Sequence, residues 1–282
     1  MTDSIFGRGT PLSARDRNAL QNRYKGVFFR ETFIAPENRP LPPGLLTEAG
    51  RLHAKLDRIL REQRVCEASR RSGALDWEAL WRFTVGNPDV FAHKTPPKAG
   101  ESDFYLLIER GDSARLRTAL LAAAVLEEAS KDLVHLKIVC FDGDADDVEH
   151  CVIRDFDQKE RGCRCCDALD QLAAGSGGRN GYSIRVAAME LQKRNKKRRV
   201  LLVLPNGLPP ACEQPPAEIA DARSAVQAAR RRGTIVIPVL YGAADVPESR
   251  ESFRQMYEKG IVSTPAENLL PALEKLIITL IR

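Results

Sequence analysis

The chain has 282 residues, 43% of them hydrophobic, which is enough for one large domain with an appendage or for two modest domains. Its formal net charge of +5 is too small for its length to indicate nucleic acid by itself. No apolar run approaches the roughly 18 residues of a membrane span, and the start lacks a signal-peptide pattern. We therefore expect a cytoplasmic protein, in which the seven cysteines are reduced thiols.

The first 100 residues are charged and show no strand signal, so residues 1–100 are predicted to form a small helical appendage. A Pro-rich linker, APENRPLPPG, occupies 35–44. Two helices are expected after it, at 45–69 and at 76–83. Another Pro-containing stretch, at 95–100, is predicted to join the appendage to the main domain.

Residues 101–282 alternate strand-length apolar runs with helical stretches, which is typical of a parallel sheet covered on both faces. Strands are predicted at 104–108, 134–141, 200–204 and 234–240, with a short edge strand at 151–154. Helices are predicted at 114–130, 183–195, 218–232, 248–257 and 269–281. The predicted fold class is therefore α/β, a doubly wound and mainly parallel sheet with its ligand site at the carboxyl ends of the strands.

Three segments in this domain resemble a known family. Glu109-Arg-Gly111-Asp-Ser113 resembles the Asp-x-Ser-x-Ser pattern of the metal-ion-dependent adhesion site of von Willebrand factor A domains. Arg-Asn180-Gly-Tyr-Ser-Ile-Arg looks like the Arg-Asp-Gly-Tyr-x-Ile-Arg segment of CobT-like cobaltochelatase subunits and NorD-like activators. Pro-Asn206-Gly-Leu-Pro is similar to that family's Ser-Asp-Gly-x-Pro. With further matches on either side, the resemblance covers roughly residues 73–282 and implies a von Willebrand factor A domain.

Departures from the family pattern predict a degenerate metal site. Glu109, Asn180 and Asn206 stand where the family has Asp, and Gly111 stands where it has the first Ser. Mg²⁺ prefers charged or polar oxygens in near-octahedral geometry at ~2.0–2.1 Å. We therefore expect Glu109, Ser113 and Asn206 to bind Mg²⁺ weakly or not at all, and no cofactor to be required. The remaining polar groups have two open interpretations: they cap a helix and fix the loops, or they dock a partner.

The resemblance implies a protein–protein interaction module that works with a MoxR-type AAA+ ATPase in metal insertion or complex maturation. A cobaltochelatase subunit is an alternative. Catalysis by a nucleophile requires an adjacent base, and none of the four histidines falls at the predicted strand ends. We therefore expect no enzymatic activity.

A concentrated basic run follows the predicted helix at 183–195. It comprises Lys193, Arg194, Lys196, Lys197, Arg198 and Arg199. This run gives a second alternative, in which the protein binds nucleic acid or an acidic protein surface. Cations are also favoured at a helix C-terminus, and no aromatic residues are interleaved to stack bases, so nucleic acid is the less favoured reading.

A cysteine-rich segment contains Cys163 and Cys166, with His150 and Cys151 upstream. These residue types and the Cys-x-x-Cys spacing are compatible with zinc. The remaining spacing does not form a second ligand pair, so a mobile loop with free thiols is the favoured interpretation.

Overall fold

The fold is known from a computed structural model of the chain. The structure describes residues 12–62, 66–70, 74–75, 91–94, 102–144, 146–156, 158, 162–194, 196–205, 215–242 and 247–281. Within these ranges, no helix combines the length and the apolar character needed to cross a membrane. The predicted boundary near residue 100 and the predicted helix at 76–83 lie outside the described residues, as does Asn206.

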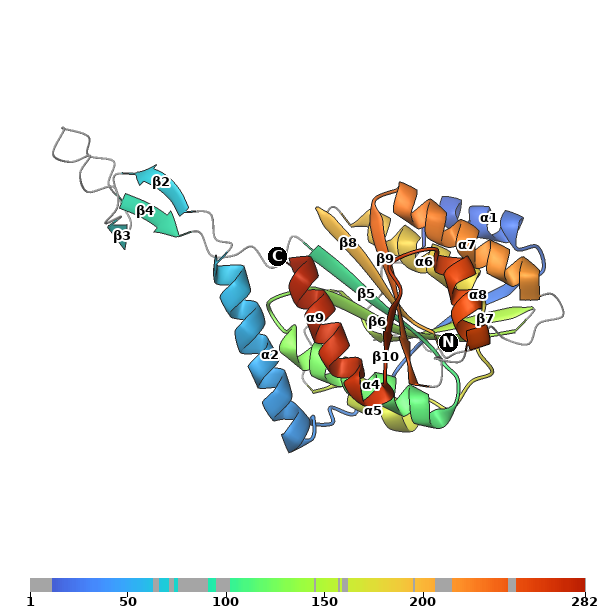
Figure 1. The fold of residues 1–282 in the computed structure, drawn as a ribbon, viewed down its shortest axis with the longest axis horizontal. Helices are drawn as coiled ribbons and strands as arrows, with labels where there is room; N and C mark the ends of the chain where they lie inside the picture. The colour runs from blue at the N-terminus through green and yellow to red at the C-terminus, as the bar shows by residue number, and fades with distance from the viewer. Residues whose placement is uncertain are drawn as a thin grey trace, which may run out of the picture.

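A seven-stranded sheet forms the centre of the domain, with strand order β1-β7-β6-β5-β8-β9-β10 (Figure 1). Its strands are β1 (Phe28–Phe33), β5 (Ser102–Glu109), β6 (His135–Gly143), β7 (Asp147–Arg154), β8 (Arg198–Leu204), β9 (Thr234–Tyr241) and β10 (Val262–Thr264). Five neighbouring strands are parallel to one another, namely β6, β5, β8, β9 and β10. Strands β7 and β1 are parallel to each other and antiparallel to these five. The predicted α/β class with a mainly parallel sheet is confirmed.

Strand β5 is the central strand of the sheet, and all eight of its residues are buried. Successive side chains of a strand point to opposite faces, so an uninterrupted apolar run requires cover on both. Phe104, Leu106 and Ile108 join the core on one face. Tyr105 and Leu107 join the core on the other. The end of β5 is therefore a rigid position for the residues that follow it.

Two groups of helices cover the sheet (Figure 1). They are α1 (Ala14–Arg23), α2 (Pro43–Glu62), α4 (Ser113–Ala129), α5 (Arg164–Gln171), α6 (Asn180–Lys193), α7 (Pro215–Arg231), α8 (Pro247–Tyr257) and α9 (Leu269–Ile281). Helices α2, α4, α5 and α9 contribute to one core, and α6, α7 and α8 to the other. Helix α4 is apolar nearly all round and buried, as its composition predicts.

The expectation that the N-terminal third lacks strands is wrong. Strand β1 extends the main sheet by pairing with β7 along its whole length. Helix α2 ends at Glu62, and Cys66–Arg70 is strand β2 in a place where the helix was predicted to continue. Strand β2 pairs with β4 (Phe91–Lys94), which also pairs with β3 (Ala74–Leu75). The first 100 residues therefore include more than a helical appendage.

Strand β7 is also not the edge strand that its sequence predicts. It spans Asp147–Arg154 and lies between β6 and β1. The apolar run at 151–154 covers only the second, buried half of the strand. The first half is more polar, and its backbone pairing with β1 cannot be recognised from its composition.

Candidate docking site at the carboxyl ends of the strands

Glu109 is the last residue of β5, and its carboxylate joins this strand to the segment before α6. The side chain is 2% exposed. Its Oε1 accepts hydrogen bonds from the Gly178 backbone N at 3.0 Å and from Asn180 Nδ2 at 3.3 Å. The structure therefore brings together two of the predicted site residues, Glu109 and Asn180. A carboxylate with these donors can fix a loop without any cation.

The glycine-rich segment before α6 packs closely against the ends of β5 and β6. The Gly175 backbone N donates to the Gly111 carbonyl at 3.0 Å. A Cβ at Gly175 would lie 2.6 Å from the Asp142 carboxylate, and one at Gly178 would lie 2.6 Å from the Phe141 ring. Glycine is required here because a side chain would push the segment away from the strands. This close approach accounts for its composition.

Asp112 and Ser113 lie where α4 begins after the β5 loop. The Asp112 side chain accepts from the Arg115 backbone N at 2.9 Å and caps the helix. Ser113 is the first residue of α4 and is exposed, as is Asp112. Ser113 therefore lies at the surface, on the turn that follows the buried Glu109.

An ion network that sequence reasoning missed lies beside Glu109. Arg110 Nη2 donates to Asp142 Oδ2 at 2.8 Å, and Arg110 Nη1 lies 3.4 Å from Glu149 Oε2. The Ser176 backbone N donates to Asp142 Oδ1 at 3.2 Å. The one available signal was that Asp142 directly follows a predicted strand. Its two partners, Arg110 and Ser176, come from other segments, so no local pattern reveals them.

The described donors do not assemble the oxygen set that a divalent cation prefers. Gly111 has no side chain, and Glu109 Oε1 already accepts from two N–H groups. Among the described residues, no three His, Cys, Asp or Glu side chains are grouped so as to hold a metal ion. Asn180 Oδ1 is buried and lacks a hydrogen-bond partner within the described part of the chain. Among the described residues, Gly111 thus offers a cation no side-chain oxygen, and Glu109 Oε1 is engaged by two N–H donors.

The motif around Gly181 has a structural explanation. A Cβ at Gly181 would collide with the Asp221 carboxylate of α7. That carboxylate accepts from Tyr24 Oη at 2.6 Å and lies 3.0 Å from Arg185 Nη2. Arg23 Nη2 also contacts this carboxylate, at 2.9 Å from Asp221 Oδ1. The Gly-x-x-x-Arg pattern thus allows α6 to approach α7 and α1, which fixes the position of Asn180 at the start of α6.

Most residues of the predicted basic run contact the rest of the domain. Lys193 lies 3.3 Å from Asp16, and Arg194 Nε donates to the buried Asp103 at 2.7 Å. Arg198 Nη1 donates to a carbonyl of α9 at 2.6 Å, and Arg199 Nη2 to the carbonyl of Arg232 at 3.0 Å. Lys196 Nζ lies 3.3 Å from His135 Nε2. These contacts give the run a structural role at the amino ends of the strands, at the opposite end of the sheet from Glu109.

The cysteine-rich segment is buried and partly helical, so the expectation of a mobile loop there is wrong. Cys163 precedes α5, and Cys165 and Cys166 lie in its first turn. Glu127 of α4 accepts from the backbone N of Arg164 at 3.0 Å and of Cys165 at 2.9 Å, thereby capping α5. Burial, and next the Glu127 carboxylate, raise the pKa of the Cys163 thiol. The free thiols are therefore protonated core residues.

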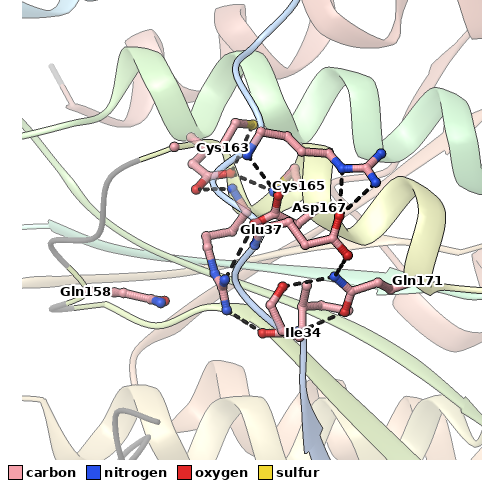
Figure 2. Close-up of polar contacts among 12 residues, drawn as sticks. Ile34, Glu37, Gln158, Cys163, Cys165, Asp167 and Gln171 are labelled. Atoms are coloured by element: carbon pink, nitrogen blue, oxygen red, sulfur yellow. Dashed lines mark hydrogen bonds and ion pairs between the residues drawn. The ribbon is translucent and has the colours of Figure 1, made fainter.

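The segment after β1 is fastened to α5 (Figure 2). Asp167 accepts from the backbone N of Glu37 and of Arg39, both at 3.1 Å. Gln171 forms a pair of hydrogen bonds with the backbone of Ala35, each 2.9 Å long. Arg164 donates to the carbonyl of Ile34. These contacts hold the N-terminal segment against the main domain.

The histidine with the strongest pKa shift is buried. His150 Nε2 lies 2.9 Å from Ser183 Oγ, and both residues are at most 1% exposed. Burial, and next Lys137, lower the pKa of His150 to about 3. A serine beside a histidine can form a nucleophilic pair, but this pair has no access to a substrate. It is best explained as a hydrogen bond within the core.

Comparisons with known proteins support the fold and do not identify a function. No protein-family model matches the chain. Over 211 residues, 71% of the chain, it is 28% identical to the uncharacterized protein YojO of Bacillus subtilis (strain 168). The chain spans about a third (33%) of the length of that relative.

Similar solved structures include domains of the von Willebrand factor A type. One is a von Willebrand factor type A protein from Catenulispora acidiphila, 15% identical, with a TM-score of 0.45 over 67% of this chain and 44% of that chain. Another is proximal thread matrix protein 1 from the mussel byssus, 12% identical, with a TM-score of 0.47 over 64% and 47% of the two chains. BatB from Bacteroides thetaiotaomicron is 16% identical, with a TM-score of 0.41 over 64% and 96%. These likenesses concern the fold alone.

Proposed function

We propose that this chain is a non-catalytic protein-interaction module that docks a partner at the carboxyl ends of its strands without a bridging metal ion. The observation that carries the proposal is the buried Glu109 carboxylate with its two N–H donors. In a metal-bridged site an acidic residue at this position would serve the cation. Here it holds the loops, while Asp112 and Ser113 are exposed next to it. Recognition then depends on hydrogen bonds and shape.

The partner that we propose is a MoxR-type AAA+ ATPase, which would act with this chain in metal insertion or in the maturation of another complex. Support comes from the resemblance of the Glu109, Asn180 and Asn206 segments to CobT-like and NorD-like proteins. The ATPase supplies the energy, and this chain couples it to a client. A cobaltochelatase subunit and a nucleic-acid-binding protein are the competing functions.

The affinity between the full chain and a MoxR-type ATPase from the same genome tests both the proposed partner and the proposed docking site at the carboxyl ends of the strands. Biolayer interferometry would compare the wild type with Ser113→Lys, in which an exposed hydroxyl at the docking end becomes a cation. Thr279→Lys is the matched control, since Thr279 is exposed near the end of α9, beside Arg198 and the amino ends of the strands. We expect Ser113→Lys to weaken binding at least about tenfold and Thr279→Lys to leave it unchanged.

The metal-free part of the proposal has its own test. Binding should be the same in EDTA and in Mg²⁺, and calorimetric titration of the wild type with Mg²⁺ should show no tight site. The Asn180→Asp/Asn206→Asp variant, which restores the family's carboxylates, should gain Mg²⁺ binding. Loss of ATPase binding in EDTA would contradict metal-free docking, and absence of any ATPase binding would contradict the partner.

A further inference from the structure

Within the described part of the chain, the first half of strand β9 has no neighbouring strand on its outer side. Strand β8 pairs with β9 from Thr234 to Pro238. Strand β10 pairs with β9 at Val239, Leu240 and Tyr241. An uncovered strand edge can accept an added chain unless charges or a loop protect it. The first half of β9 therefore lies at an edge of the described sheet, where Arg230 Nη2 already donates to the Val236 carbonyl at 3.0 Å.

A groove of about 460 Å³ follows this open edge. Its lining comprises Arg230, the five residues 233–237, Lys259 and Gly260. Five residues of extended chain span roughly 16 Å. Ile235 is 40% exposed, one of four large hydrophobic side chains this accessible in the described part of the chain. The groove thus has the length and the apolar contact that suit an extended peptide segment.

The groove also contains an unused hydrogen-bonding group. Thr234 is 2% exposed, and its Oγ1 has no hydrogen-bond partner within the described residues. A buried hydroxyl without a hydrogen-bond partner destabilises the fold. An acceptor atom of a bound segment would satisfy it. Thr234 is therefore an observation pointing to a ligand that is independent of the exposed Ile235.

The charge around the groove is positive. Arg230 and Lys259 line it, and Arg231 and Arg232 are exposed immediately before Gly233. The nearest described acid on the 257–260 turn is Glu258, which already binds Arg223 and Gln227, both at 2.7 Å. The cations at this end therefore exceed the available acids, and their field attracts a negatively charged partner.

We propose that this groove binds an extended acidic segment of a partner protein. Acidic side chains of the segment contact Arg231, Arg232 and Lys259, an apolar side chain packs on Ile235, and an acceptor atom takes the Thr234 hydroxyl. The apolar strand edge favours a peptide over a single-stranded nucleic acid, because no aromatic residue lines the described groove to stack a base. The site lies at the opposite end of the sheet from Glu109 and is independent of the docking function proposed above.

Fluorescence anisotropy on the full chain tests this proposal with three labelled probes. They are an octapeptide of alternating Glu and Val, its counterpart with Lys for Glu, and a single-stranded octauridylate. We expect saturable binding of the Glu–Val peptide that weakens as salt is added, and no saturable binding of the Lys–Val peptide. Ile235→Asp and Arg231→Glu/Arg232→Glu should each weaken binding at least about tenfold.

Phe28→Asp provides the matched control, since Phe28 is 70% exposed on β1 at the opposite edge of the sheet. This variant should bind the Glu–Val peptide as the wild type does. The double arginine variant changes exposed side chains alone, so loss of folding does not confuse its result. Three results would overturn the proposal: no binding of the acidic peptide, preferential binding of the octauridylate, or equal affinity of Ile235→Asp and wild type.

Discussion

Replacement of Glu109 tests what holds the strand-end site together. The carboxylate accepts from Gly178 N at 3.0 Å and from Asn180 Nδ2 at 3.3 Å. Glu109→Ala leaves both donors buried without this acceptor, and each such group costs about 1–3 kcal/mol. We therefore expect a loss of about 2–5 kcal/mol in the free energy of unfolding. Glu109→Gln keeps a carbonyl oxygen that can accept from both donors, so it should cost less than about 1.5 kcal/mol.

Urea unfolding of the full chain, followed by far-UV circular dichroism, measures these differences. Asp112→Ala is a useful reference, because it removes an exposed helix cap and should cost about 1 kcal/mol. Equal destabilisation by Glu109→Gln and Glu109→Ala would show that the site requires negative charge and not merely an acceptor. That result would refute the metal-free interpretation, particularly if Mg²⁺ also raised the stability of the wild type.

Three further predictions concern buried ionisable groups. Lys137 is 1% exposed and lies 2.8 Å from Glu190, so Lys137→Met should cost about 3–5 kcal/mol by urea unfolding, part of which Glu190→Gln should restore in the same chain. The pKa of His150 falls to about 3 on folding, so between about pH 6.5 and 3 the unfolded chain binds a proton that the folded chain does not. The free energy of unfolding should therefore drop by about 2 kcal/mol from pH 7 to pH 5. The drop should be smaller in His150→Gln, which has no imidazole to protonate. Burial raises the pKa of the Cys140 and Cys165 thiols, so Ellman's reagent should label them far more slowly in the native protein than in urea, as peptide mapping would show.

The central sheet could be predicted from sequence because its strands are buried on both faces and therefore read as apolar runs. Strand β5 is the clearest case. Strand β1 could not be predicted in this way, since its sequence FFRETF has four exposed and two half-buried positions and leaves Phe28 at the surface. Its place depends on pairing with β7, more than a hundred residues away. Short edge strands of mixed polarity give little periodic signal.

The candidate site was only partly predictable for the same reason. The resemblance directed attention to Glu109 and Asn180, whose side chains are hydrogen-bonded to each other. It gave no indication that Arg110 binds Asp142, a contact that depends on how β5 and β6 are aligned. Helix α5 was missed because its cap is Glu127 of α4 and not a residue of its own segment. Local sequence patterns detect a helix start only when the capping residue belongs to the helix's own segment.

The two proposed surfaces lie at opposite ends of the same parallel strands. Strand β9 has eight residues, so its ends are roughly 26 Å apart, whereas the Debye length at physiological salt is about 8 Å. A charge change at Ser113 therefore leaves the potential around Ile235 nearly unchanged. Distant sites that share no contacts contribute independently to binding. The two proposed surfaces could therefore bind their partners at the same time, so a variant at one surface should leave binding at the other unchanged.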